Sequence, residues 1–141
     1  MRSDEAKFVE FVLGIETGKE IWGGVGISCI DWSPLEDNLL AAVTLKTDRL
    51  EIWNVQRGVM LAIHDLCGKI VSVKWSPHDD STLIAMEKNN PKIQMINYKT
   101  GKQKILEMDT VSTAMCWHPR MPNHVLFGGI KGMLSLCNVH D

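Results

Sequence analysis

The chain has 141 residues and a formal net charge of −2 at pH 7, with a sequence pI near 6.2. This balance excludes the broadly basic surface that drives non-specific nucleic-acid binding, and the length suits one domain with a substantial core. The sequence has no charged-then-apolar signal segment and no apolar stretch near the ~18 residues of a membrane span. We therefore expect a cytoplasmic or nuclear protein without a membrane partner.

A phrase centred on tryptophan recurs three times along the chain. The tryptophans are 43 and 42 residues apart, and the phrases are Asp31-Trp32-Ser33-Pro34, Lys74-Trp75-Ser76-Pro77 and Cys116-Trp117-His118-Pro119. A self-similar period in the forties is typical of propellers and solenoids, in which each repeat buries its apolar faces against its neighbours. The phrases therefore set the register for the elements that follow.

The first predicted elements form the end of one blade, in residues 8–24. Residues 8–15 match a third strand, because Gly18 aligns with Gly58 and Gly101, and a short fourth strand follows near residues 19–22. Trp22 lies outside the matched positions, beside Gly23-Gly24. It is either a core residue of the fourth strand or an exposed aromatic anchor for a partner.

A full blade is predicted for residues 25–66. A strand ends at Trp32, the apolar run Leu40-Ala41-Ala42 suits a strand buried on both faces, and apolar and polar residues alternate up to Asn54. A fourth strand is placed in residues 59–64. Turn residues such as Thr47-Asp48 and Arg57-Gly58 separate these segments.

The same order of elements repeats in residues 67–109, a second full blade, and in residues 110–141, an incomplete one. Asparagines at equivalent positions, spaced 43 and 41 residues, end the third strand of each repeat: Asn54, Asn97 and Asn138. Short antiparallel strands in sets of four at this period predict an all-β fold: four-stranded blades of a β-propeller with an incomplete ring. The residues that define the repeat are Trp32, Pro34, Trp53, Asn54, Trp75, Pro77, Asn97, Trp117, Pro119 and Asn138, and we expect the tryptophans to pack between blades.

Over essentially its whole length the chain resembles the WD-repeat family. Trp53-Asn54 stands where that family usually has Trp-Asp, the Gly-His signature is poorly kept, and Ile96 and Cys137 replace the family tryptophan. The resemblance implies a scaffold that presents loops and blade edges to proteins, peptides or RNA, usually without catalysis or a cofactor. Substrate receptors of cullin-RING ubiquitin ligases carry Trp-Asp-x-Arg at this point, whereas here Arg57 comes one position late and the acid is absent.

The pattern accounts for about three and a quarter blades, whereas closed rings need at least ~4. Three interpretations remain open: a fragment or short isoform of a longer propeller, an arc completed by a second copy or another chain, or a small closed fold. An uncompleted arc would leave apolar blade faces exposed.

Loops joining fourth to first strands and second to third strands should share one face of the ring, and we expect partners to bind there. The candidate binding residues are Trp22, Lys46, Asp48, Lys88, Asn90 and Lys131. An RNA-binding role would instead use Trp22 and the lysines of the second repeat, namely Lys88, Lys92, Lys99, Lys102 and Lys104. Acidic pairs at Glu36-Asp37 and Asp79-Asp80 favour a basic partner on the loops after the Ser-Pro turns.

Residue types capable of catalysis or metal binding are present but scattered. His78, His118 and His124 fall in separate loops without a recognised ligand spacing, and no serine or cysteine in a strained turn accompanies His64-Asp65. We therefore expect neither an enzyme nor a bound metal. The four cysteines, Cys29, Cys67, Cys116 and Cys137, form no Cys-x-x-Cys pair and are interpreted as reduced core thiols.

Overall fold

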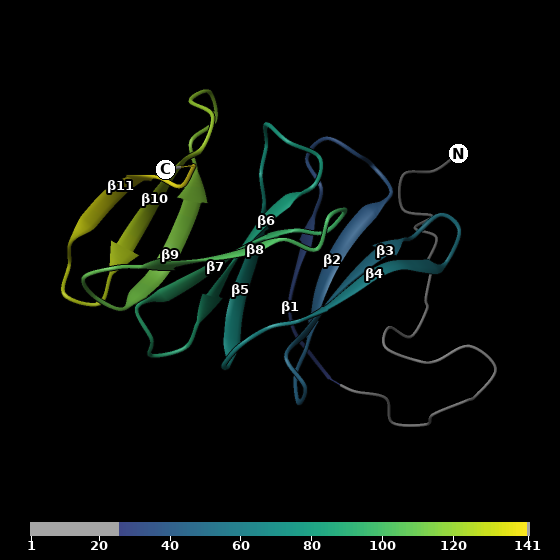
Figure 1. Ribbon diagram of the computed structural model, residues 1–141, viewed down its shortest axis with the longest axis horizontal. Helices are drawn as coiled ribbons and strands as arrows, with labels where there is room; N and C mark the ends of the chain where they lie inside the picture. The colour runs from purple at the N-terminus through teal and green to yellow at the C-terminus, as the bar shows by residue number, and fades with distance from the viewer. Residues whose placement is uncertain (1–25, 141) are drawn as a thin grey trace, which may run out of the picture.

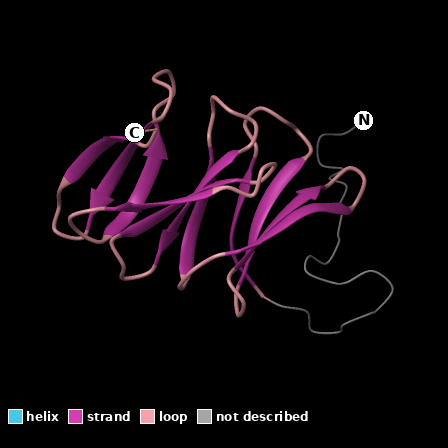
Figure 2. Ribbon diagram, in the orientation of Figure 1, coloured by secondary structure: helices cyan, strands magenta, loops and turns pink. Residues whose placement is uncertain are grey.

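Residues 26–140 are described by a computed structural model, in which eleven strands form three antiparallel sheets (Figures 1 and 2). The sheets follow one another in chain order as an arc. None of the described residues is helical, so this part of the chain has no helix that could cross a membrane. Residues 8–24 and Trp22, predicted to end a preceding blade, lie outside the described residues.

Each sheet is one blade, with strands hydrogen-bonded in sequence order. The first blade contains β1 (Ile27–Trp32), β2 (Leu39–Thr44), β3 (Arg49–Asn54) and β4 (Val59–Asp65). The second contains β5 (Ile70–Trp75), β6 (Thr82–Glu87), β7 (Lys92–Asn97) and β8 (Gln103–Glu107), and the third contains β9 (Ser112–Trp117), β10 (His124–Gly129) and β11 (Leu134–Asn138). The predicted fold class, antiparallel four-stranded blades in an incomplete ring, is confirmed.

The pairing register repeats from blade to blade. Trp32 lies opposite Leu40, Trp75 opposite Leu83, and Trp117 opposite Val125. Strands β2 and β6 are buried along nearly their whole length, because a neighbouring strand lies on either side and apolar residues occupy both faces. The continuous apolar runs of the sequence therefore mark the second strand of each blade.

The residue after each repeated tryptophan holds the turn that follows its strand. Oγ of Ser33 accepts a hydrogen bond from the amide of Glu36 at 3.1 Å, and Oγ of Ser76 accepts one from His78 at 3.2 Å. In the third blade Nδ1 of His118 accepts from Arg120 and Met121 at 3.0 and 2.9 Å. Histidine thus performs the local task of serine, which explains the change in the third phrase.

The repeated asparagines fix the turns that follow the third strands. Oδ1 of Asn54 accepts from the amide of Arg57 at 3.0 Å, Oδ1 of Asn97 from Lys99 at 3.0 Å, and Oδ1 of Asn138 from His140 at 3.0 Å. Asparagine side chains make such bonds to backbone a few residues onward in turns. The spacing of 43 and 41 residues therefore reflects one recurring turn.

The core lies between blades. One cluster joins the first and second blades, with Val43, Leu50 and Ile52 packed against Val73 and Trp75. A second cluster joins the second and third blades and includes Ile84, Met86, Ile93, Met115, Trp117, Val125 and Phe127. Since each cluster takes residues from two sheets, a blade is stabilised chiefly by its neighbours.

Two of the repeated tryptophans attach their blade to the preceding one. Nε1 of Trp75 donates to the carbonyl oxygen of Asp31 at 2.9 Å, and Nε1 of Trp117 donates to that of Lys74 at 3.4 Å. Trp75 also packs edge-on against the ring of Tyr98, with centroids 5.6 Å apart. The carbonyl acceptor is in each case the residue just before the preceding tryptophan.

Trp32 corrects the expectation that every repeated tryptophan packs between blades. Its side chain is 53% exposed, against 3% for Trp75 and 8% for Trp117. The surface equivalent to the one that receives Trp75 would belong to a preceding blade, and residues 26–140 contain none. Burial of this position therefore depends on a neighbour and not on the local sequence.

The cysteines are free thiols, but only in part core residues. Cys29 and Cys137 are half-buried, and burial raises the pKa of both thiols. Cys67 and Cys116 are exposed, the first in the connection between β4 and β5 and the second on β9. The expectation of four core thiols is thus wrong for these two.

Candidate functional site

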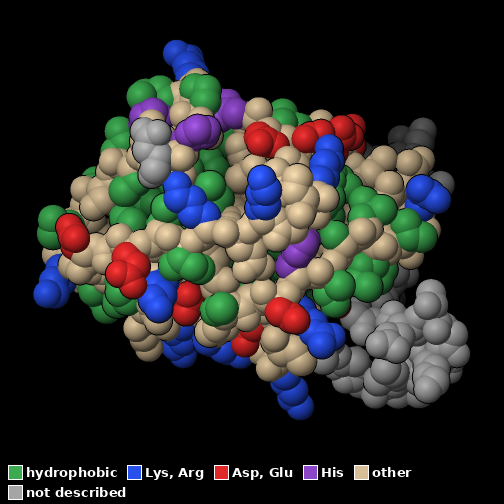
Figure 3. Space-filling view, viewed as in Figure 1, with side chains coloured by type: hydrophobic (Ala, Val, Ile, Leu, Met, Phe, Trp, Pro, Cys, Tyr) green, Lys and Arg blue, Asp and Glu red, His purple; other side chains and the backbone are tan. Residues whose placement is uncertain are grey.

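The loops proposed for binding lie at one end of the sheets, the lower edge in Figure 1. They are the β2–β3, β6–β7 and β10–β11 turns within blades, residues 45–48, 88–91 and 130–133, and the connections between blades, residues 66–69 and 108–111. Each carries exposed lysine or lies beside a loop that does, and Figure 3 shows Lys and Arg side chains protruding along this edge. We call this surface the lysine edge and define it by Lys46, Lys69, Lys88 and Lys131.

Hydrogen bonds between neighbouring loops make the lysine edge a fixed surface. Oδ1 of Asp48 accepts from the amide of Ile70 at 3.0 Å, and the carbonyl oxygen of Asp48 accepts from Leu66 at 3.1 Å. Asp48 has a φ of +48°, a left-handed conformation that aspartate tolerates better than most residues. Its carboxylate thus ties the first blade to the start of the second, a role in stability that sequence alone did not suggest.

Gln94 provides a second tie that the sequence analysis missed. This fully buried side chain accepts from the amide of Cys67 at 3.1 Å and donates to the Cys67 carbonyl oxygen at 2.7 Å. It also donates to Oε2 of the buried Glu87 at 3.3 Å. A polar residue in the middle of an apolar strand was the available signal, since buried amides require partners.

The lysines differ in how firmly they are held. Lys46, Lys88 and Lys131 are exposed, one in each blade, whereas Nζ of Lys69 donates to the carbonyl oxygen of Leu45 at 2.6 Å. Asn90 is half-buried, and its Oδ1 accepts from the amide of Lys92 at 3.0 Å. Lys46, Lys88 and Lys131 therefore offer ammonium groups to a partner, while Asn90 shapes its turn.

A shallow hollow lies on the same edge at the third blade. Its apolar lining includes Met108, Phe127 and Met133, and Asp109 and Thr110 lie at its polar side. Phe127 is buried and Met133 is exposed, so the hollow leads from the surface toward the core between the second and third blades. The hollow is small, and two of its lining residues, Gly129 and Met133, flank the turn that carries Lys131.

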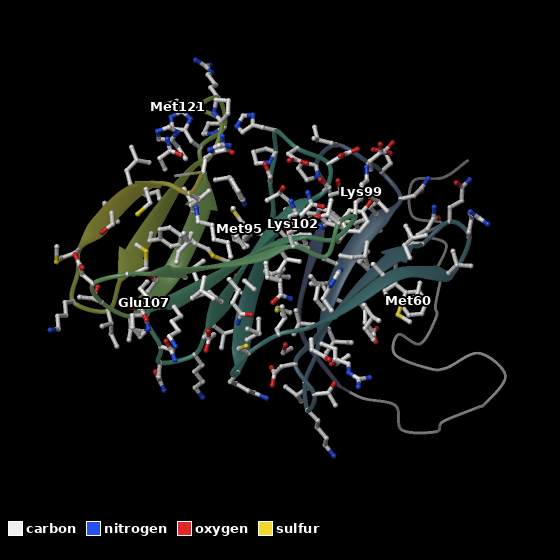
Figure 4. All side chains as sticks on the ribbon, viewed as in Figure 1. Met60, Met95, Lys99, Lys102, Glu107 and Met121 are labelled. Carbon is white, nitrogen blue, oxygen red and sulfur yellow. The ribbon has the colours of Figure 1, made fainter. Side chains whose placement is uncertain are left out.

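The lysines of the second repeat do not form one basic surface. Lys88 and Lys92 lie toward the lysine edge, whereas Lys99 and Lys102 belong to the β7–β8 turn at the other end of the same sheet (Figure 4). Nζ of Lys99 is 3.1 Å from Oδ2 of Asp80, and Nζ of Lys104 donates to the Val139 carbonyl oxygen at 3.3 Å. The fold thus divides a charge cluster that is continuous only in the sequence.

The acidic pairs occupy the end opposite the lysine edge, in the loops β1–β2 and β5–β6. Asp79 has its own local task there. Burial by itself raises the pKa of this carboxyl, but hydrogen bonds from the amide and hydroxyl of Ser81 and the hydroxyl of Thr82 outweigh it and lower the pKa. Asp79 is therefore committed to its loop, and Asp80 to Lys99.

The third blade exposes the face that in the second blade is covered. Ile84 and Ile93 of the second blade are fully buried against the third, whereas at the equivalent positions Leu126 is 39% and Leu134 is 74% exposed. We call this surface the trailing face: Cys116, Leu126, Leu134 and Leu136. The repeat alignment alone could have found it.

The first blade exposes the opposite type of face. Ile30 is 58% exposed, whereas its equivalents Val73 and Met115 are buried against preceding blades. With Trp32 it forms a surface that we call the leading face. The described arc thus ends in two apolar surfaces of different kinds, and neither contains a residue that was predicted to bind a partner.

The histidines serve turns and blade contacts. Nε2 of His78 bonds the carbonyl oxygen of His118 at 2.9 Å, and Nε2 of His64 bonds that of Tyr98 at 3.2 Å, each linking two blades. Within residues 26–140 no three or more His, Cys, Asp or Glu side chains converge in a way that could hold a metal ion.

Comparison with solved structures finds the same architecture elsewhere. The chain is similar to one in the "Crystal Structure of Mitotic Checkpoint Complex", with a TM-score of 0.66 and 19% sequence identity. The match covers 82% of this chain and 38% of that one, so this chain spans well under half of the structure it matches. No protein-family model matches the sequence, and no curated protein matches it. At this identity the similarity establishes the β-propeller fold alone.

Proposed function

We propose that the chain is a non-catalytic scaffold that binds a partner protein at the lysine edge. The observation that carries the proposal is the presence of exposed lysines in equivalent turns of three successive blades. Asp48 and Gln94 hold the connection between the first two of these blades, and the amide of Ile130 donates to the Val111 carbonyl oxygen in the third. Rigid loops lose little conformational entropy on binding, which favours affinity. The resemblance to WD repeats and the likeness to a chain of a mitotic checkpoint complex support a role in protein assemblies.

The chemistry of the edge indicates the kind of partner. Lys46, Lys88 and Lys131 would attract carboxylates, and the small hollow lined by Phe127 and Met133 offers an apolar contact surface to a partner's side chain. An acidic peptide segment with an apolar residue satisfies both features. Charge attraction would raise the association rate, and the apolar contact would slow dissociation.

RNA binding is less well supported by the arrangement of charges. The lysines of the second repeat point to opposite ends of the blade, and Lys99 is paired with Asp80. RNA binding gains from a continuous groove of basic and aromatic side chains that follows the phosphate backbone. We therefore include a single-stranded RNA as a second ligand in the test.

The test is the triple variant Lys46→Glu, Lys88→Glu and Lys131→Glu in the full 141-residue chain. Fluorescence anisotropy would measure binding of a labelled acidic peptide that contains one leucine, and separately of a single-stranded RNA. We expect peptide affinity to fall at least tenfold, because three attractive charges become repulsive, with little change in RNA binding. The wild-type affinity should also weaken as salt is raised.

The matched control reverses three charges at the opposite end: Arg57→Glu, Lys102→Glu and Arg120→Glu. All three side chains are exposed, and the change in net charge is the same as in the lysine-edge variant. Peptide binding should stay within twofold of wild type. Equal losses in both triple variants would show that overall charge and not the lysine edge determines binding, and tight, salt-sensitive RNA binding would favour the RNA alternative.

A further inference from the structure

The chain carries both halves of its own blade–blade interface, one at each end of the arc. The leading face, Ile30 and Trp32, is equivalent to Val73 and Trp75 of the second blade, which pack against the first blade. The trailing face is the type of surface that the second blade offers to the third. Between these ends the structure shows the same interface formed twice.

The internal interfaces show what such a contact consists of. An indole of the later blade donates to the carbonyl oxygen preceding the earlier tryptophan, as Trp75 does to Asp31 and Trp117 does to Lys74. Apolar residues from the second and third strands of the earlier blade cover it. On the third blade the equivalent carbonyl belongs to Cys116, and the equivalent apolar residues are Leu126, Leu134 and Leu136.

We propose that two copies of the chain associate head to tail, with the leading face of each copy packed on the trailing face of the other. Trp32 of one copy would then donate from Nε1 to the Cys116 carbonyl oxygen of its partner. The side chains of Ile30, Leu126, Leu134 and Leu136 would be removed from water. Both contacts continue an interface that the chain already makes, which is the reason for assigning a second copy to these faces.

The number of blades allows such an assembly to close. The three blades described in residues 26–140 of each copy give six, and β-propellers typically have roughly 4–8. A contact between different faces generates a closed ring when its rotation permits, and a ring uses every face. The assembly should therefore stop at two copies, and it is separate from the lysine edge, so that either proposal can fail alone.

The first test is the mass of the purified 141-residue chain in analytical ultracentrifugation. We expect a concentration-dependent species of about twice 15.9 kDa. Trp32→Ala and the double variant Leu134→Lys with Leu136→Lys should each give monomers, because each removes one half of both contacts. Since all three positions are exposed in the single chain, circular dichroism should show an unchanged fold.

Mixing the two variants distinguishes head-to-tail association from other modes. The Trp32→Ala copy retains a trailing face and the double-lysine copy retains a leading face, so the mixture should form a heterodimer held by one contact. Ile105→Lys serves as the control, because this exposed residue lies on the outer strand β8 away from both faces and should leave the dimer intact. A wild-type chain that stays monomeric, larger open polymers, or a Trp32→Ala variant that still dimerises would overturn the proposal.

Discussion

The second and third blades present the same face with opposite exposure. Ile93 on β7 and Leu134 on β11 occupy equivalent positions, yet Ile93 is fully buried and Leu134 is mostly exposed. Both residues are apolar and both lie in a third strand, so residue type and local structure do not cause the difference. It arises because a blade follows the second sheet within the described arc and none follows the third. Burial in this fold is a property of neighbouring blades.

The largest expected effect comes from placing a charge at the covered position. Ile93→Lys should reduce the free energy of unfolding by more than about 4 kcal/mol, because it leaves an unpaired ammonium between blades. Leu134→Lys should change it by no more than about 0.5 kcal/mol at dilution where the chain sediments as a monomer. Urea denaturation followed by tryptophan fluorescence measures both, and similar losses would show that another segment covers the trailing face in solution.

The tryptophans at the opposite end of the arc also differ in exposure. Trp75→Phe should cost about 2 kcal/mol, since it removes the hydrogen bond to the Asp31 carbonyl and part of a buried ring. Trp32→Phe, in monomeric protein, should cost no more than about 0.5 kcal/mol. The check is again urea denaturation. A large cost at Trp32 would mean that the leading face is covered.

Comparison with the sequence shows what repeats can and cannot predict. The tryptophan and asparagine spacings predicted the blades and their register because each residue has a short-range task, such as the turn bonds of Ser33 and Asn54. Exposure of Trp32 was not predicted, because residues 8–24 were expected to form the end of a preceding blade. The part played by Asp48 was not predictable either, because its carboxylate meets an amide 22 residues away only after two blades have packed.

The carboxylate of Asp48 links the first blade to the second. Asp48→Ala should cost between about 1 and 2 kcal/mol, because the Ile70 amide loses its acceptor. Asp48→Asn should cost less, since an amide oxygen can still accept and asparagine tolerates the left-handed conformation. Lys46→Ala, two residues earlier and exposed, is the control and should be neutral in thermal denaturation. Equal melting temperatures for all three variants would contradict the structural assignment.

The smallest expected effect concerns Asp31, which lies between the first and second blades. Lys74 occupies the equivalent position between the second and third blades. Burial raises the pKa of Asp31 above its ordinary 3.8, and the amide of Trp75 and the charge of Lys74 offset only part of this rise. The folded chain therefore holds this proton more tightly than the unfolded chain does. Its contribution to the free energy of unfolding falls as pH rises from 3.8 through the raised value.

The measurement is the difference in stability between Asp31→Asn and wild type across that pH range. The variant should lack this part of the pH dependence and at neutral pH should be more stable by under about 0.5 kcal/mol, because the half-exposed site is screened by solvent. Identical pH profiles would remove Asp31 as a titrating group at the interface.

The outer side of β11 is the edge of the third sheet. In the first two blades a fourth strand pairs with the third, but the described part of the third blade ends at β11. Its row of backbone amides and carbonyls, together with Leu134 and Leu136, is a template for intermolecular β-sheet formation. Heat-induced precipitates should therefore begin at this strand. Leu136→Pro should delay their onset, because the register of the β10–β11 pair directs the Leu136 amide away from β10, to the outer edge.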